Sequence, residues 1–315
     1  MYTNLIDTHC DTAYEIFKRN ESIKQNTCHI SIDKAKEFKN YAQFFAIWSD
    51  KNKSDEQAFE DFLKIRDYFK RDIEKNSEYI SFVRSYEEMK TALSQNKIAA
   101  FLAVEDARIL SGDLDRLDIL HESGVKYLTL MWGGNTCIGA SHNADGGLTE
   151  FGRAVVEKCF KIGIVPDVSH ANEQTTSDII EIAYKFNKPV IASHSNSYSL
   201  YPHSRNLRDD HVRAIINLGG IIGVSLCPYH LTNTKKKACD ASDVADHILK
   251  YVSLGAENNI GLGCDLDGTD LPYGFHGVND LTSISKELQI RGVSDSVIQK
   301  ILYENYYNFI KNNFN

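Results

Sequence analysis

The chain has 315 residues, of which 42% are hydrophobic and 25% charged, which is enough apolar material for a large core and argues against disorder. The formal net charge of −8 argues against a nucleic-acid partner, since phosphate backbones repel an acidic protein, and the run Lys235–Lys237 is expected to be only a solvated loop. With no signal peptide, no apolar run of roughly 18 residues and scattered cysteines without a CxxC pair, the chain is expected to work in a reducing cytoplasm, away from membranes.

Eight short runs that are almost continuously apolar recur along the chain, and segments of helical pattern separate them. Runs of this length and character are typical of parallel strands that are buried on both faces. In chain order, the predicted strands are residues 5–9, 42–48, 99–105, 127–132, 164–170, 189–194, 220–226 and 260–265.

The segments between these strands carry signals of helix starts and stops. Ser54–Gln57 has the form of a capping box and precedes a helical stripe of apolar residues. Residues 76–96 predict a second helical stretch between the second and third strands, which would add cover to the fold. Four glycines stand where helices should stop, each shortly before a strand: Gly124, Gly163, Gly219 and Gly255.

Eight strand–helix alternations in 315 residues predict a closed (β/α)8 barrel, a TIM-like α/β fold of the metal-dependent hydrolase type, with residues 1–315 as one domain. An open doubly wound sheet is the alternative architecture. It is disfavoured because neither GxGxxG nor GxxxxGK[ST] follows a predicted strand, and Gly261–Gly263 is followed by Leu266 in place of the third glycine.

Residues able to bind metals or move protons gather where the predicted strands end. In a (β/α)8 barrel, this end of the strands carries the active site. Five of the eight strands end in a histidine or a carboxylate, whereas the strand starts show no such enrichment. The residues are His9 with Asp11, Glu105 with Asp106, Asp167 with His170, His194, and Asp265 with Asp267.

A metal centre is the interpretation that these strand ends favour together. Residues two apart on a strand share a side, so His9 and Asp11 point the same way and Cys10 points the opposite way. Taken singly, each histidine is as readily a hydrogen-bonded core residue, and each aspartate a turn former. Gathered at one mouth and buried without partners, they would cost several kcal/mol, which a divalent metal ion would remove.

Imidazole and carboxylate ligands together suit zinc, with manganese or iron as alternatives. Five ligands are too many for one catalytic zinc ion and suit two ions per chain, with Glu105 as the bridging carboxylate. The expected ligands are His9, Asp11, Glu105, His170 and His194. Of Asp265 and Asp267, one is expected to act as a general acid or base and the other to support it.

Other chemistries find less support in the sequence. The run Asp265–Asp270 is not an EF-hand, because its glycine comes too early in the loop. There is no GxSxG motif, and the serines on either side of His194 should face away from it, which disfavours serine catalysis. Cys10 and Cys264 are expected to be small core thiols, with a cysteine nucleophile left open.

Six short motifs, in order and at suitable spacing, give nearly the whole chain a resemblance to the renal dipeptidase (membrane dipeptidase) family of zinc metallopeptidases, as a soluble member of bacterial type. Each motif is weak alone, but the set is specific. The motifs are Ile6–Asp11, Gly147–Gly152, Pro166–His170, Ser193–Ser195, Arg205–Asp210 and Gly263–Gly268.

The resemblance implies a dinuclear zinc dipeptidase, a hydrolase that cleaves the peptide bond of dipeptides, including those with a C-terminal D-residue. It implies that the residues matching His9 and Asp11 hold the first zinc ion. Those matching His170 and His194 hold the second ion, and Glu105 bridges both, in agreement with the argument from the strand ends.

The resemblance also assigns roles around the metals. The residue matching Arg205 receives the free carboxylate of the dipeptide, and the residue matching Asp265 handles protons at the scissile amide. Trp132 stands where animal members carry a substrate-contacting histidine, so the orientation of the substrate could differ. Trp132 and Asn135 are further candidates for substrate contact.

Two other functions remain as alternatives. A metal-dependent amidohydrolase or deaminase could use the same barrel, but such enzymes commonly begin with H-x-H, whereas Asp11 stands in the second place here. A non-catalytic relative that binds metal or peptide is disfavoured because all five ligands and Arg205 are present. The expected partner is a dipeptide, and a homodimer is left open because barrels of this family often pair.

Overall fold

The computed structural model describes residues 3–233 and 239–315, so the run Lys235–Lys237 lies outside the described residues. At the centre of the protein is a parallel β-sheet of nine strands. The strands are β1 (Asn4–Cys10), β2 (Asn40–Trp48), β3 (Ile80–Phe82), β4 (Ile98–Glu105), β5 (Val125–Thr129), β6 (Val165–Asp167), β7 (Ile191–Ala192), β8 (Ile221–Val224) and β9 (Ile260–Leu262).

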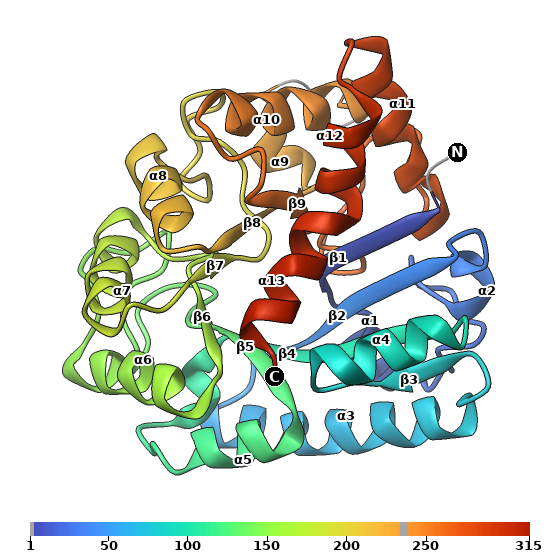
Figure 1. The fold of residues 1–315 in the computed structure, drawn as a ribbon. Helices are drawn as coiled ribbons and strands as arrows, with labels where there is room; N and C mark the ends of the chain where they lie inside the picture. Colours follow the sequence, from blue (N-terminus) through green and yellow to red (C-terminus); the bar gives the residue numbers. More distant parts are fainter. Residues whose placement is uncertain (1–2, 234–238) are drawn as a thin grey trace.

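Eight of these strands close into a barrel (Figure 1). β1 lies between β2 and β9, and the remaining strands follow in reverse chain order from β9 to β4. The ring closes because β4 also pairs with β2, from Ala42 opposite Ala99 to Trp48 opposite Glu105. The predicted (β/α)8 barrel is therefore confirmed.

The ninth strand, β3, is absent from the sequence prediction and corrects the expectation that residues 76–96 are helical. β3 pairs with residues 98–100 at the start of β4. β5 pairs with β4 only from Leu102 onward. β3 therefore occupies an edge of β4 that β5 leaves open, and the helix of this segment, α4, covers only Tyr86–Ser94.

Most helices lie on the outer side of the barrel (Figure 1). They are α1 (Thr12–Arg19), α2 (Ile32–Ala35), α3 (Asp55–Lys75), α4 (Tyr86–Ser94), α5 (Arg116–Ser123), α6 (Glu150–Ile162), α7 (Glu173–Phe186), α8 (Asp209–Asn217), α9 (Pro228–Leu231), α10 (Ala241–Ser253), α11 (Thr282–Ile290), α12 (Asp295–Gln299) and α13 (Asn305–Asn313). Three helical turns of other types are η1 (Ala107–Leu110), η3 (Val278–Leu281) and η4 (Lys300–Glu304). No helix within residues 3–233 and 239–315 is long and apolar enough to cross a membrane.

The predicted helix signals occur at the ends of these helices. Ser54 and Gln57 form the capping box that begins α3. Gly124 and Gly163 end α5 and α6 in the left-handed conformation, which glycine adopts without strain. The helices therefore stop where the sequence indicates, and the chain turns directly into β5 and toward β6.

Helix α13 closes the end of the barrel at which the strands begin. Tyr306 lies against Gly261 of β9, where a Cβ atom would come within 2.2 Å of the tyrosine ring, so only glycine leaves room. The hydroxyl of Tyr306 lies 3.0 Å from Oγ1 of Thr8 on β1. Phe314 packs on Phe44 of β2, with ring centroids 6.1 Å apart. The strand ends that carry the candidate functional residues lie at the opposite end.

Candidate metal centre

The five expected metal ligands meet at the mouth of the barrel. His9 lies in β1 and Glu105 is the last residue of β4, whereas Asp11, His170 and His194 lie on the loops that follow β1, β6 and β7. All five side chains are buried. Ligand atoms of His9, Glu105 and His194 lie within 4.8 Å of one another. The structure thus brings the five residues together, and their role as ligands stays a prediction.

Glu105 divides its two carboxylate oxygens between two groups of histidines. Oε1 lies 2.8 Å from Nε2 of His170 and 3.5 Å from Nε2 of His194. Oε2 lies 3.6 Å from Nε2 of His9, which is itself 3.8 Å from Oδ1 of Asp11. A carboxylate placed in this way can serve two cations, one on each side.

A tyrosine fixes which nitrogen of His9 faces the cluster. The hydroxyl of Tyr127 on β5 donates to the carbonyl oxygen of Thr8 at 2.7 Å. The same hydroxyl lies 2.8 Å from Nδ1 of His9, so Nδ1 carries the ring hydrogen and donates it to Tyr127. Nε2 of His9 is then the nitrogen directed into the cluster, and a metal ion that displaces its hydrogen would find a lone pair there.

The other two histidines are oriented in the same way. Nδ1 of His170 lies 2.9 Å from the carbonyl oxygen of Trp132, which can only accept a hydrogen bond. Nδ1 of His194 lies 2.7 Å from Oγ of Ser193, whose own hydrogen goes to Asp167 at 2.5 Å. Both histidines therefore present Nε2 lone pairs to the cluster. These two nitrogens are 3.0 Å apart, close enough that one cation could be held by both histidines.

The charge and hydrogen bonding of the cluster fit divalent cations. Nε2 of His9 and Oδ1 of Asp11 are buried without a hydrogen-bond partner in the described part of the chain. Burial lowers the pKa of His9, but the carboxylates of Glu105, Asp265 and Asp11 outweigh this effect and raise that pKa to about 10. The carboxylates thus favour positive charge at Nε2, which a metal ion would supply.

Asp265, rather than Asp267, faces this cluster. Oδ1 of Asp265 lies 3.8 Å from Nε2 of His9. Burial raises the pKa of Asp265 to about 7, although His9 opposes the shift. Asp267 instead accepts hydrogen bonds from the hydroxyl of Thr12 and from the backbone N–H of His29, at 2.5 and 2.6 Å. Of the two candidates for proton transfer, Asp265 is therefore the one beside the cluster, and its role stays a prediction.

Left-handed backbone conformations occur where several of these residues leave their strands. The angle φ is 68° at His170, 59° at Asp265 and 69° at Asp267. Non-glycine residues in this region cost on the order of 1 kcal/mol each, and they gather at functional sites. The sharp turns place successive side chains at the mouth of the barrel instead of continuing the strand.

The structure corrects the expectation that the serines beside His194 face away from it. β7 spans only two residues, so Ser193 lies in a turn and its Oγ reaches the imidazole. Ser193 is still no activated nucleophile, because its hydrogen goes to Asp167 and not to His194. Cys10 and Cys264 are fully buried, and burial raises the pKa of both thiols well above the usual range. Both features are those of small thiols packed in a core.

A cavity of about 470 Å³, here called the metal cavity, adjoins the cluster. Arg205 and Trp132, two of the expected substrate contacts, line it. Arg205 is only 5% exposed, and its Nη1 is buried with no hydrogen-bond partner among the described residues. Asn135 is exposed and lies outside the lining that the described residues form, whereas Asn143 of the same loop belongs to it.

Sequence reasoning missed the residues that orient the histidines and part of the cavity wall. Tyr127 and Ser193 both fall within predicted strands, where an inward hydroxyl near a histidine is a usable signal. His142, Asn143 and His230 also line the metal cavity. His142 and Asn143 lie on a loop, which has no periodicity to indicate which way a side chain points, and His230 lies in the short helix α9.

A closed parallel barrel with histidines and carboxylates gathered at the strand ends defines the class of metal-dependent (β/α)8 hydrolases. A sequence model of the membrane dipeptidase family, peptidase family M19, matches residues 2–313. The chain therefore belongs to the membrane dipeptidase family, and the resemblance seen in its motifs is confirmed.

Individual relatives agree with this assignment. Dipeptidase aclJ of Aspergillus oryzae is 32% identical over 209 residues, which cover 64% of this chain and 48% of that protein, so the match spans about half the length of that relative. The structure of dipeptidase AC, of family M19, has a TM-score of 0.92 at 22% identity and covers 100% of this chain and 99% of its own.

A metallopeptidase from Rhodobacter sphaeroides, solved with a phosphinate mimic of the dipeptide L-Ala-D-Ala, has a TM-score of 0.89 at 22% identity. The match covers 99% of this chain and 100% of that one. The probable dipeptidase PvdM from Pseudomonas aeruginosa has the same TM-score at 18% identity, with coverage of 98% and 95%. At these identities, the solved structures establish a shared fold.

Proposed function

We propose that the protein is a dinuclear metal-dependent dipeptidase, which hydrolyses the peptide bond of dipeptides. The observation that carries the proposal is the division of the Glu105 carboxylate between His9 on one side and His170 with His194 on the other. Membership of the membrane dipeptidase family supports the same activity, as do the relatives named as dipeptidases.

Two zinc ions per chain are the proposed cofactors, with manganese or iron as alternatives for the same ligand types. His9 and Asp11 would hold one ion, His170 and His194 would hold the other, and Glu105 would contact both. When bound, the ions would activate a water molecule and polarise the carbonyl group of the scissile bond.

Arg205 is proposed to bind the free C-terminal carboxylate of the dipeptide. Burial lowers the pKa of Arg205, but a guanidinium stays charged near neutral pH because its ordinary pKa is far higher. A charge-assisted pair with this buried, unpaired donor would be strong and would fix the orientation of the substrate. Because Arg205 is held in the cavity wall, the carboxylate of a longer peptide would lie beyond its reach.

Asp265 is proposed to handle the proton that the leaving amine needs. A carboxyl group with a pKa of about 7 can both accept and donate a proton near neutral pH. Its Oδ1 lies 3.8 Å from Nε2 of His9, so the carboxyl group stands beside the cluster, and His9, Asp11 and Asp265 also form a group that could hold a metal ion. Glu105 contributes to catalysis through its position between the two groups of ligands.

Trp132 is proposed to form a wall of the substrate site. Its ring centroid lies 6.1 Å from that of His170 and 5.4 Å from that of Trp48, and the residue lines the metal cavity. An indole orients a substrate mainly by its shape. We do not extend this role to Asn135, which is exposed outside the cavity. Acceptance of a C-terminal D-residue is proposed because the Rhodobacter sphaeroides structure contains a mimic of L-Ala-D-Ala.

Three wider proposals accompany this one. A cytoplasmic location is supported by seven cysteines that are all free. A single domain over residues 1–315 is supported by the hydrophobic clusters, which fill the barrel and the space between barrel and helices. A homodimer stays a prediction, which the mass of the protein in solution would test.

Metal analysis combined with hydrolysis assays tests the proposed activity. We expect about two metal ions per chain, and cleavage of L,L and L,D dipeptides that a chelator abolishes and zinc restores. The variant Glu105→Gln should lose both metal ions and activity, whereas Glu304→Gln, at an exposed position, should keep both. Two metal ions without dipeptide cleavage would favour an amidohydrolase, a deaminase or a binding protein, and absence of metal after reconstitution would refute the site.

A further inference from the structure

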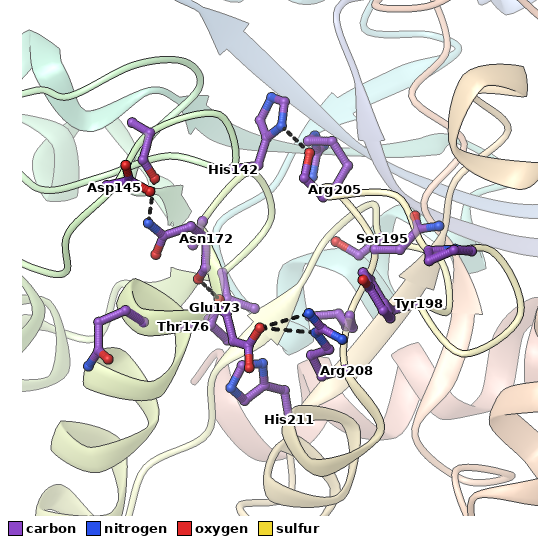
Figure 2. A pocket seen from close by; sticks show the side chains of 18 of the residues that line it. His142, Asp145, Asn172, Glu173, Thr176, Ser195, Tyr198, Arg205, Arg208 and His211 are labelled. Carbon is purple, nitrogen blue, oxygen red and sulfur yellow. Dashed lines mark hydrogen bonds and ion pairs between the residues drawn. The ribbon is translucent and has the colours of Figure 1, made fainter.

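A second cavity, which we call the side cavity, lies beside the metal cavity and shares part of its wall with it, including Arg205 (Figure 2). Its volume is about 490 Å³. Three segments form most of its lining: residues 142–146, residues 172–176 at the start of α7, and residues 195–208 after β7. Figure 2 shows side chains from all three segments around one hollow.

Arg205 and His142 belong to the walls of both cavities. They lie together at one end of the side cavity in Figure 2. The backbone N–H of His142 donates to the carbonyl oxygen of His170 at 2.7 Å, and Nδ1 of His142 lies 2.9 Å from Oγ of Ser204. The shared wall is therefore fixed in place, and a molecule in the side cavity would meet the same guanidinium as the substrate.

Two polar atoms of this wall are buried without a partner in the residues that the structure describes: Nη1 of Arg205 and Oδ1 of Asn206. Arg205 is 5% exposed and Asn206 is 7% exposed. The orientation of the Asn206 amide is fixed, because its Nδ2 donates to the carbonyl oxygens of Tyr201 and His230, each at 2.8 Å. A buried polar atom without a partner destabilises the protein, so a ligand that pairs both atoms would be favoured.

The other charges of the side cavity are paired or lie at its rim. Oε2 of Glu173 accepts from Nε and Nη2 of Arg208, at 3.1 and 3.0 Å, and the Arg208 guanidinium lies 3.5 Å from the centroid of the Tyr198 ring. Figure 2 shows this ion pair at the end opposite Arg205. Asp145 adds an exposed carboxylate to the lining. The buried part thus offers one cationic donor and, on the next residue, one neutral acceptor.

We propose that the side cavity binds a free α-amino acid as its zwitterion. The carboxylate pairs with Arg205, and the ammonium group donates to Oδ1 of Asn206, with attraction from Asp145 at the rim. A simple anion would leave Asn206 unpaired, and a simple amine would leave Arg205 unpaired. The inference rests on the proposed dipeptidase function, because free amino acids are the products of that reaction. A bound product would compete with the dipeptide carboxylate for Arg205 and so inhibit the enzyme.

Calorimetric titration of the metal-loaded protein with L-alanine and D-alanine tests this recognition directly. We expect alanine to bind, and at least tenfold weaker binding of alaninamide, which lacks the carboxylate, and of propionate, which lacks the ammonium group. Equal binding of propionate and alanine would overturn the zwitterion assignment, and no binding of alanine would overturn the site. These titrations need no turnover, so they give an answer even if the protein cleaves no dipeptide.

The variant Ala144→Tyr tests where the amino acid binds. Ala144 lines the side cavity but not the metal cavity, so the new ring would fill the former alone. Glu181→Tyr, which adds the same ring at a side chain that is 58% exposed on α7, is the matched control. We expect the dissociation and inhibition constants of alanine to rise at least tenfold in Ala144→Tyr and to stay within twofold in the control, with the dipeptide KM within twofold in both. Unchanged alanine binding in Ala144→Tyr would place the amino acid elsewhere and overturn the proposal.

Discussion

Replacement of Tyr127 by phenylalanine should weaken one metal site and leave its neighbour intact. The hydroxyl of Tyr127 accepts a hydrogen bond from Nδ1 of His9 and donates one to the carbonyl oxygen of Thr8. Phenylalanine keeps the ring and removes both bonds. His9 could then adopt its other tautomer, with a hydrogen on Nε2 where a metal ligand needs a lone pair.

The magnitude follows from the two groups that lose their partner. Each buried polar group without a partner costs about 1–3 kcal/mol, so the free energy of unfolding should fall by roughly 2–6 kcal/mol. Loss of a group that orients a ligating histidine weakens metal binding by about 10–100-fold. This weakening should fall on the ion that we propose for His9 and Asp11, because His170 and His194 keep the acceptors of their Nδ1 hydrogens.

Metal titration of the variant by calorimetry, with metal analysis after partial chelation, measures this effect. Tyr306→Phe is the matched control, because its hydroxyl lies 3.0 Å from Oγ1 of Thr8 and the variant loses a buried contact next to His9 without touching the imidazole. We expect Tyr127→Phe to retain about one tightly bound ion and Tyr306→Phe to retain about two. Equal metal affinities in the two variants would refute the reasoning.

Arg205→Met should raise the KM for dipeptides by about 10–100-fold with a smaller change in kcat, because a charged hydrogen bond contributes about 1.5–3 kcal/mol. Steady-state kinetics of this variant, compared with those of Arg205→Lys, measure the effect, and an unchanged KM would contradict the role. Gly261→Ala would place Cβ 2.2 Å from the ring of Tyr306 and should lower stability to urea by about 1–3 kcal/mol; wild-type stability would contradict the packing. Burial lowers the pKa of His247, so on acidification the unfolded chain takes up a proton at this residue at a higher pH than the folded protein does. The contribution of neutral His247 to stability is therefore complete above the ordinary pKa of about 6.5 and is lost as the pH falls below it. The free energy of unfolding should therefore fall from about pH 7.5 to about pH 5.5, and fall less in His247→Asn, whose amide can still accept from the backbone N–H of Ser197; equal falls in both proteins would count against this account.

The positions of the strand ends could be predicted because barrel geometry leaves them little freedom. His9, Glu105 and Asp265 each stand at the end of an apolar run, and parallel strands carry such ends to one face. Arg205 differs, because it lies on the long connection between β7 and α8, where no periodicity marks a functional side chain. Only the family resemblance pointed to it from the sequence.

The features that escaped prediction depend on contacts between segments that are distant in sequence. β3 pairs with the first residues of β4, which β5 leaves unpaired. The three residues of β3 carry no sequence signal of this pairing. Ser193 reaches His194 because β7 ends after two residues, well short of the predicted strand 189–194. The backbone of Asn135 forms an antiparallel bridge with that of Ala140 across a loop, and the Asn135 side chain is exposed outside the metal cavity.

Helix α13, which closes one end of the barrel, is synthesised after all the strands that it covers. The strand that carries His9 leaves the ribosome long before Tyr306 and Phe314, whose rings occupy the far end of the barrel, and the contact between Thr8 and Tyr306 joins residues 298 positions apart. Until β9 arrives, the nascent chain has an unpaired edge on β1 and an apolar interior open to water, both of which favour aggregation. Chaperones that shield such edges should therefore improve the yield of folded protein.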